Sequence, residues 1–438
     1  MIRRLALLAL CLGVPAAAWA QAPLTLPEAI TRAQAANPDA RAAEVAEQQA
    51  ASRLTQARAG YLPSVDLTES WQRGNQPVFV FSSLLAQRQF AASNFAIDAL
   101  NRPDAVGNLR LGITLDQAVF DPATRAGVRA ATIGRDLATT SRAVVAQDLA
   151  LAVTGAYGAV LAADAAGRAA AATLDAATAD LELAQNRRDA GRVTDADVLR
   201  IEVFLARARE QQIRSTADAT IARARLNQLM GEPLDAAFTL DATPAPEALA
   251  ATDVAALEAE AVTARADLRL SALQEQLAAA AVDAARANFL PRVYAQGGYE
   301  ANGGTWGSRA SSWMAGAVAR VNLFRGFADQ ARLAEARHTQ SLRAIEREKA
   351  DTAARLDVRM AVARLEAARA AEGVGRSAVA QARESHRIVR DRYDSGLADV
   401  AALVAAAEAV QQAEARHAAA RVDVTVAAAT LSRALGKR

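Results

Sequence analysis

The most constraining feature of this chain is a stretch of sequence that occurs twice. Residues 37–67 and 265–295 align without a gap at an offset of 228 residues. The matched pairs farther along share an offset of 205 residues: Gly191 with Gly396, and Gly231 with Gly436. An internal duplication predicts two copies of one structural unit. We therefore expect a first repeat at 21–252 and a second at 253–438, with an extra segment between residues 72 and 108 of the first.

The first twenty residues have the pattern of a secretory signal peptide. Arg3 and Arg4 precede an apolar stretch, and Ala18-Trp19-Ala20 forms a small-x-small cleavage site. The apolar stretch is too short to cross a bilayer as a helix, so residues 1–20 are expected to be cleaved after export. The only cysteine, Cys11, lies in this segment behind the large Leu10, which disfavours lipid attachment. The mature chain would then have neither a thiol nor a disulfide.

Composition favours long, closely packed helices over a globule. Apolar residues make up 52% of the chain but aromatic residues only 4%, and alanine is abundant. Alanine is the best helix former, and small side chains let helices approach closely. The formal net charge of +2 falls to zero when Arg3 and Arg4 are removed. Bulk charge therefore gives no reason to expect a nucleic-acid partner.

Helix start and stop signals divide each repeat into the same elements. Thr194 with Asp197 has the pattern of a helix start, and Gly191 that of a helix stop. Residues Leu137, Val144, Leu151 and Gly158 recur every seven positions, as in a coiled-coil seam. The expected helices cover residues 25–36, 37–60, 122–189, 194–230, 253–288, 328–394 and 399–435. An irregular connector is expected at 231–252, with a short strand at 238–240.

Four segments alternate between apolar and polar residues and are expected to be strands. They cover residues 64–71, 109–119, 292–300 and 313–323, and their length fits a tilted membrane strand. A membrane does not tolerate open sheet edges, so membrane strands must close into a barrel. Four strands are too few for a barrel, whereas two chains would supply eight and three chains twelve. The alternative is a soluble helical protein with two small sheets.

Together these features resemble the TolC-like outer-membrane efflux protein family. The resemblance is carried by the duplication, by the helix-to-strand turns ARAGYLPSVDL and ARANFLPRVYA, and by the glycines at 191 and 396. It implies a mainly α fold with membrane β. Duplicated long helical hairpins would form a coiled-coil periplasmic tunnel, and four strands per chain would complete a homotrimeric 12-stranded barrel. It further implies an outer-membrane exit duct of a tripartite efflux pump or type I secretion system.

The resemblance also implies partners and site residues. A periplasmic adaptor, working with an inner-membrane transporter, would dock at the hairpin tips and open the duct for small molecules or polypeptides. The docking residues would be Gly191, Arg192, Val193, Thr194, Ser395, Gly396 and Leu397. The gate candidates would be Asp197, Tyr393, Asp394 and Asp399. An acidic ring that some members carry would fall near Ala402 and Ala405, which are not acidic here.

Aromatic residues at strand ends are expected to contact the interfacial region of the outer-membrane lipid. Trp71, Tyr299 and Trp313 hold these positions. The segment 72–108 is expected to be a loop that folds over the barrel mouth or lies beside it. A second loop between strands is expected at 303–307, on the extracellular side.

No pattern for enzymatic chemistry is present in the sequence. A nucleophile elbow, an HExxH motif and a phosphate loop are all absent. His338, His386 and His417 lack the spacing of a metal site, so neither a metal nor another cofactor is expected. The remaining alternative is a periplasmic coiled-coil scaffold or adaptor-like protein without a pore.

Overall fold

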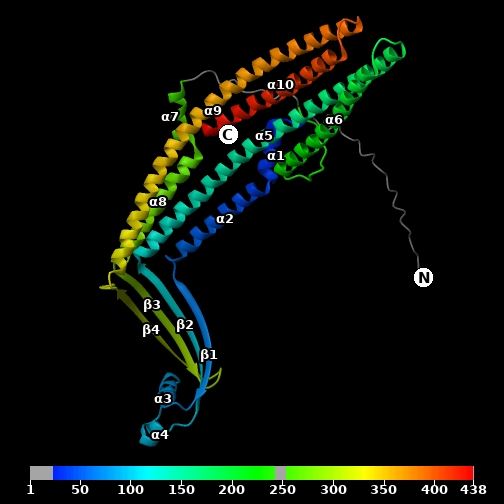
Figure 1. Ribbon diagram of the computed structural model, residues 1–438. Helices are drawn as coiled ribbons and strands as arrows, with labels where there is room; N and C mark the ends of the chain where they lie inside the picture. The colour runs from blue at the N-terminus through cyan, green and yellow to red at the C-terminus, as the bar shows by residue number, and fades with distance from the viewer. Residues whose placement is uncertain (1–22, 242–252, 438) are drawn as a thin grey trace, which may run out of the picture. The chain divides into compact units, whose positions relative to one another are not determined.

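The computed structural model describes residues 23–241 and 253–437. The expected signal peptide at 1–20 and residues 242–252 of the expected connector lie outside the described residues. The helices are α1 (Leu26–Ala36), α2 (Pro38–Ala59), α3 (Pro77–Ala86), α4 (Ile97–Asn101), α5 (Pro122–Asp189), α6 (Asp195–Met230), α7 (Val254–Ala264), α8 (Ala266–Ala287), α9 (Ala328–Asp394) and α10 (Val400–Ala434). The strands are β1 (Ser64–Gly74), β2 (Val106–Phe120), β3 (Arg292–Gly303) and β4 (Arg309–Arg320) (Figure 1).

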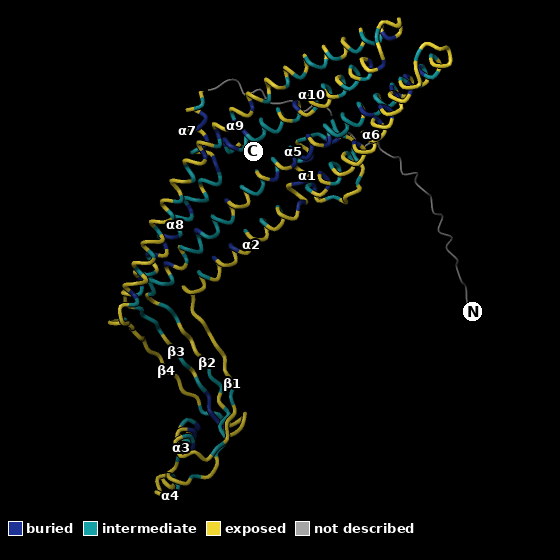
Figure 2. The backbone as a smooth tube through the Cα atoms, in the orientation of Figure 1, coloured by how far each residue is buried: buried dark blue, intermediate teal, exposed yellow. Residues whose placement is uncertain are grey.

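The four strands form one antiparallel sheet in the order β1-β2-β3-β4. Its register aligns side chains of like polarity across the strands. Leu67 pairs with Ile113, Ile113 with Tyr299, and Tyr299 with Trp313. Because successive side chains of a strand point to opposite faces, one face of the sheet is apolar and the other polar. Figure 2 shows β1 and β4, the two edges, as exposed along almost their whole length.

The strands differ in their bounds from the sequence prediction. The last strand, expected at 313–323, runs from Arg309 to Arg320, because the hairpin ladder continues to the pair Gly303–Arg309. The backbone leaves the sheet after Arg320, and Gly326 and Phe327 both have positive φ angles. The prediction that Trp71, Tyr299 and Trp313 end their strands was therefore wrong, since all three lie inside the ladders.

The segment between β1 and β2 is not the irregular loop that we expected. It contains α3, a single turn of 3-10 helix at Ala92–Phe95, and α4. Pro77 occupies the first position of α3, and the side chain of Gln76 accepts a hydrogen bond from the Phe79 amide at 2.9 Å. Proline at this position and a polar cap both favour helix initiation. Sequence reasoning missed the helix because ten mostly apolar residues show no helical period.

The helices pack through small residues. The described residues cluster into two compact units, and one of them contains the described parts of Met1–Pro38, Leu149–Ala251 and Ala361–Leu431. In this unit Ala170, Ala177 and Ala184 lie one heptad apart on α5, and all three are buried. Alanines at this spacing let neighbouring helices approach closely. The abundance of alanine therefore has a direct role in packing.

The second unit consists of Asp39–Asp148, Thr252–Met360 and Ser432–Arg438 in their described parts, and it contains another error in the helix prediction. A single helix was expected over 253–288, but the chain breaks at Arg265 into α7 and α8. Arg265 has an extended backbone, with φ −67° and ψ 128°. Its buried guanidinium bonds Asp267 at 2.6 Å and Asp357 of α9 at 3.1 Å. These charge-assisted bonds are available because the break directs Arg265 inward.

The first repeat has a similar break at Asn37, between α1 and α2. In each repeat a glycine after α6 or α10 packs against the break. Gly231 ends α6 at φ +71°, and a Cβ added there would lie 2.6 Å from the carbonyl oxygen of Ala36. Gly436 follows α10 at φ +74°, and a Cβ would lie 2.8 Å from the carbonyl carbon of Ala264. In both places a left-handed turn and a close backbone approach require glycine.

These contacts predict a difference between two glycines with the same backbone conformation. Gly191 also has a positive φ, but nothing lies within 4 Å of its added Cβ. Gly191→Ala should cost about 1–2 kcal/mol for the left-handed backbone alone. Gly231→Ala should cost about 2–5 kcal/mol, because steric overlap adds to the same strain. Thermal unfolding in detergent, followed by circular dichroism, compares the two variants. Equal melting temperatures would contradict the packing role of Gly231.

Candidate functional site: the helical tips

The turn between α5 and α6 is built by a hydrogen-bonded C-cap. The Gly191 amide donates to the Arg188 carbonyl and the Arg192 amide to the Arg187 carbonyl, both at 2.8 Å. This is the Schellman arrangement, which needs a left-handed residue at Gly191. Thr194 then caps α6 through a capping box with Asp197.

The turn between α9 and α10 repeats this construction. The Gly396 amide donates to the Tyr393 carbonyl at 3.0 Å, and the Leu397 amide donates to the Arg392 carbonyl at 2.7 Å. The Asp399 carboxylate accepts a bond from the Ala402 amide at 2.8 Å, so it caps the first turn of α10. The two tips are thus one motif built twice.

The two tips pack against each other through a buried cluster. Its buried members come from all four helices: Ala184, Val198, Ile201, Tyr393, Val400 and Leu403. All of them lie in the unit that contains Ala361–Leu431. Burial of this cluster stabilises the contact between the two hairpins, because removal of apolar surface from water is favourable.

Arg187 is the main polar connection between the tips. Its guanidinium donates to the Tyr393 carbonyl at 3.0 Å and to the Asp394 carboxylate at 3.2 Å. It also lies 4.6 Å from the centre of the Tyr393 ring, which is cation–π range. Arg390 of α9 reaches back to the buried Asp180 of α5 at 3.4 Å. Sequence reasoning missed Arg187, although the duplication aligns it with Arg392.

The gate candidates occupy different environments within the tips. Tyr393 is 3% exposed, and its hydroxyl has no hydrogen-bond partner among the described residues. Asp394 pairs with Arg187, whereas Asp399 serves as a helix cap. The Asp197 carboxylate accepts from the Thr194 hydroxyl at 2.8 Å and from its amide at 3.1 Å. Arg187 therefore contacts both Tyr393 and Asp394, whereas Asp197 and Asp399 each cap their own helix.

The expected docking residues lie at the surface. Gly191, Arg192, Thr194, Ser395, Gly396 and Leu397 are exposed, and Val193 is half-buried. Among them, Leu397 is 70% exposed. These residues give each tip a small surface with apolar and polar parts.

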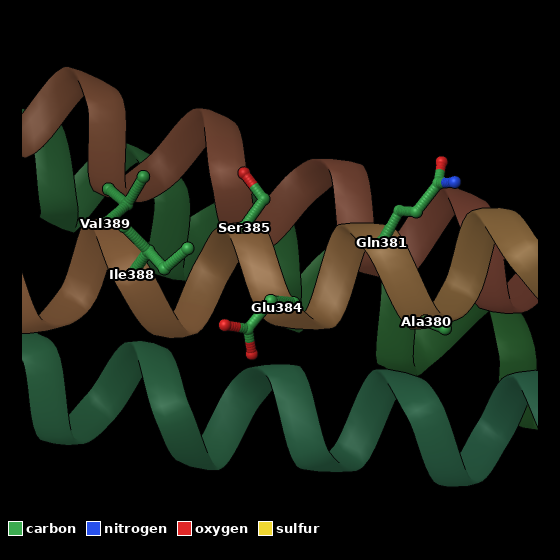
Figure 3. Close-up of a pocket in the computed structure, with 6 residues that line it drawn as sticks. All are labelled: Ala380, Gln381, Glu384, Ser385, Ile388 and Val389. Atoms are coloured by element: carbon green, nitrogen blue, oxygen red, sulfur yellow. The ribbon is translucent and has the colours of Figure 1, made fainter.

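A shallow depression lies on α9 close to the second tip. It has a volume of about 540 Å³, and one helix supplies all its lining residues: Ala380, Gln381, Glu384, Ser385, Ile388 and Val389. In Figure 3 Gln381 and Ser385 point to one side of α9 and Glu384 to the other. The side chains do not converge, so this depression lacks the geometry of a ligand pocket.

The aromatic residues expected at the membrane interface share the apolar face of the sheet. Tyr299 and Trp313 pair directly, and Trp71 pairs with Leu109 on the same face. All three are largely exposed, with Trp313 at 79%. An exposed row of aromatic and aliphatic side chains on one face is typical of strands that face lipid.

The histidines do not belong to any cluster of metal ligands in the part of the chain that the structure describes. No group of three or more histidines, cysteines or carboxylates that could hold a metal is found within residues 23–241 and 253–437. His417 lies 3.2 Å from Glu372. A single carboxylate beside a histidine forms an ordinary polar contact and lacks the ligand count of a metal centre.

A sheet with one apolar face suited to lipid, joined to long paired helices with capped tips, defines a membrane channel protein with a helical extension. Comparison with known proteins agrees: the profile of the outer membrane efflux protein family matches residues 29–232 and 257–437. The chain belongs to this family. It is an outer-membrane efflux channel protein with its helices in the periplasm, and the pore-free scaffold is not favoured.

Individual relatives support the same assignment. Protein CyaE of Bordetella pertussis is 28% identical over 320 residues, which are 72% of this chain and 68% of CyaE. The Campylobacter jejuni CmeC outer membrane channel superposes with a TM-score of 0.79 at 16% identity, covering 94% of this chain and 85% of CmeC. The open state of the Neisseria gonorrhoeae MtrE channel gives 0.77 at 20% identity, covering 94% and 89%. At these identities the structural matches establish the fold.

The capping box of the first tip predicts a pH dependence. The hydrogen bonds from Thr194 lower the pKa of the Asp197 carboxyl below its ordinary value. A lowered folded-state pKa stabilises the helix start above the unfolded pKa, and this stabilisation is lost as the pH falls through the folded value. Hydrogen exchange of the first-turn amides of α6, corrected for intrinsic rates, should show loss of protection on acidification. Asp197→Asn should be less protected at neutral pH and lack this pH dependence, and an unchanged profile would contradict the assignment.

Proposed function

We propose that three copies of this chain form a channel with a shared twelve-stranded barrel. The supporting observation is the four-stranded sheet, whose edges β1 and β4 are unpaired in the described chain. Unpaired backbone groups cannot face lipid, so each edge must meet the edge of another copy. Two copies would give eight strands and a barrel filled by side chains, whereas three copies give twelve and leave a lumen for export.

Exposed apolar stripes on the helices support assembly as well. Leu199, Val203, Ile213 and Ile221 lie along one side of α6, and each is more than half exposed. Another exposed set lies on α9: Leu356, Met360, Val374 and Ile388. Apolar stripes of this length on a monomer would favour association, and neighbouring copies of the chain would cover them.

The tips are the proposed docking surface for a periplasmic adaptor, which couples the duct to an inner-membrane transporter. Such surfaces commonly lie on exposed turns held by a rigid scaffold, and both tips fit this description. Leu397 would provide an apolar contact, and Thr194 and Ser395 would provide hydrogen-bonding groups. The cargo would be a small molecule or a polypeptide, selected by the transporter.

Gating follows from the contacts between the tips. Arg187 connects the two hairpins within one copy, and it holds Tyr393 and Asp394 in their present positions. An adaptor that binds the separated tips more tightly than the packed tips would shift the population towards the open duct.

Photo-cross-linking in living cells tests the docking proposal. A photoreactive residue in place of Leu397 should capture a periplasmic adaptor, identified by mass spectrometry. The matched control is Val45 on α2, which is 62% exposed, compared with 70% for Leu397, and lies outside both apolar stripes. Capture from both positions, or from Val45 only, would contradict docking at the tips. Purified protein in mild detergent should have the mass of three chains, and a monomer would contradict the shared barrel.

Removal of Arg187 tests the gate. Arg187→Ala should increase the conductance of the channel in planar bilayers without an adaptor, because the two tips lose their main polar connection. Arg188→Ala is the matched control, since Arg188 bonds only its neighbour Asp189 in the described structure. We expect roughly a several-fold increase for Arg187→Ala, because a partly exposed ion pair contributes up to about 1 kcal/mol. Equal conductance of the two variants would contradict the proposed gate.

A further inference from the structure

The α3 helix has a polar anchor that sequence analysis did not reveal. The side-chain amide of Gln87, just after the helix, donates to the Gly107 carbonyl at 2.9 Å and to the Asn108 side chain at 3.0 Å. Asn108 in turn donates to the side chain of Asn302 at 2.9 Å. Gln87 and Asn302 are both buried. These amides form a ladder from α3 across β2 to β3.

This ladder identifies the face of the sheet that α3 covers. Asn108 alternates along β2 with Leu109, Leu111 and Ile113, so its side chain lies on the polar face. Asn302 lies on the same face, because it pairs with Arg110, two residues from Asn108. In a membrane barrel the apolar face contacts lipid and the polar face lines the lumen. In the barrel proposed above, on which this inference rests, α3 therefore lies on the lumen side.

The two sides of α3 differ in exposure. Val80 and Ser83 are buried towards the sheet, together with Gln87 after the helix. Val78, Phe81 and Leu85 lie on the opposite side at helical spacing, and Val78 is 71% exposed. Figure 1 shows α3 beside the ends of the strands that lie away from the long helices. An apolar surface thus points away from the wall of the barrel, where lipid cannot reach it.

The size of the barrel indicates what covers this surface. Twelve strands about 4.8 Å apart and tilted by about 40° give a barrel roughly 24 Å across. An α-helix with its side chains is about 10 Å thick. Three such helices side by side need a clear width of about 21 Å, which is more than the inward side chains of the wall leave free. The helices would therefore meet at the mouth of the barrel, where α3 lies beside the strand ends.

We propose that the α3 helices of three copies pack against one another at the outer mouth of the barrel, through Val78 and Leu85. The contact forms an apolar constriction at the exit of the duct. A hydrophobic constriction resists the passage of water and ions unless the helices separate. The extra segment of the first repeat would therefore provide a second closure, far along the chain from the tips.

Disulfide cross-linking tests this contact, because the chain has a single cysteine, Cys11, in the segment expected to be removed. Val78→Cys and Leu85→Cys are each purified in mild detergent, oxidised, and separated under denaturing conditions. Both should give a covalent dimer together with monomer, since three thiols at one axis leave one unpaired. Leu67→Cys is the control, because Leu67 is 69% exposed on the lipid-facing side of β1. It should remain monomeric.

The outcomes separate this inference from the trimer proposal. Monomer bands for both α3 variants, in samples with the mass of three chains and reactive thiols, would overturn the α3 contact. Thiols that react only with a lipid-soluble maleimide would place α3 in the outer leaflet, and this too would overturn it. A wild-type protein that is monomeric in detergent would instead refute the proposed barrel itself.

Discussion

The need to pair every backbone hydrogen-bonding group in a membrane governs this structure. The sheet of β1 to β4 has one apolar face and two free edges, and neither edge can remain in lipid alone. In the proposed trimer each edge pairs with the edge of a neighbouring copy. The exposed apolar stripes of α6 and α9 support this proposal, because neighbouring copies would cover them.

The long helices set the length of the part that lies in the periplasm. Helices α5 and α9 contain 68 and 67 residues, and each runs without a break. Long helices in contact need a narrow, regular seam, and buried alanines at 170, 177 and 184 provide one. Each long helix is accompanied by shorter helices, with a break at Asn37 or Arg265. A glycine-capped helix end meets each break, so the joint is built twice by the same means.

Different interactions hold the turns of the tips and the contact between the tips. The turns are fixed by backbone hydrogen bonds and helix caps, which depend on few neighbours. The contact between the tips depends on a buried cluster, on Arg187 and on the pair of Arg390 with Asp180. A change that affects only this contact could separate the hairpins without unfolding either turn. This division between rigid turns and a separable contact suits a gate.

The sequence by itself determined the local elements. Proline, glycine and capping residues placed the ends of α5, α6, α9 and α10 to within one or two residues, because these signals act on their own backbone. Alternation identified all four strands for the same reason. It could not give the bounds of β4, which depend on pairing with β3, or the break at Arg265, which depends on Asp357 from a distant helix. Only the tertiary structure decided that α3 covers the polar face of the sheet and that Arg187 joins the tips. Both facts depend on contacts between residues far apart in the chain, and local propensity carries no information about such contacts.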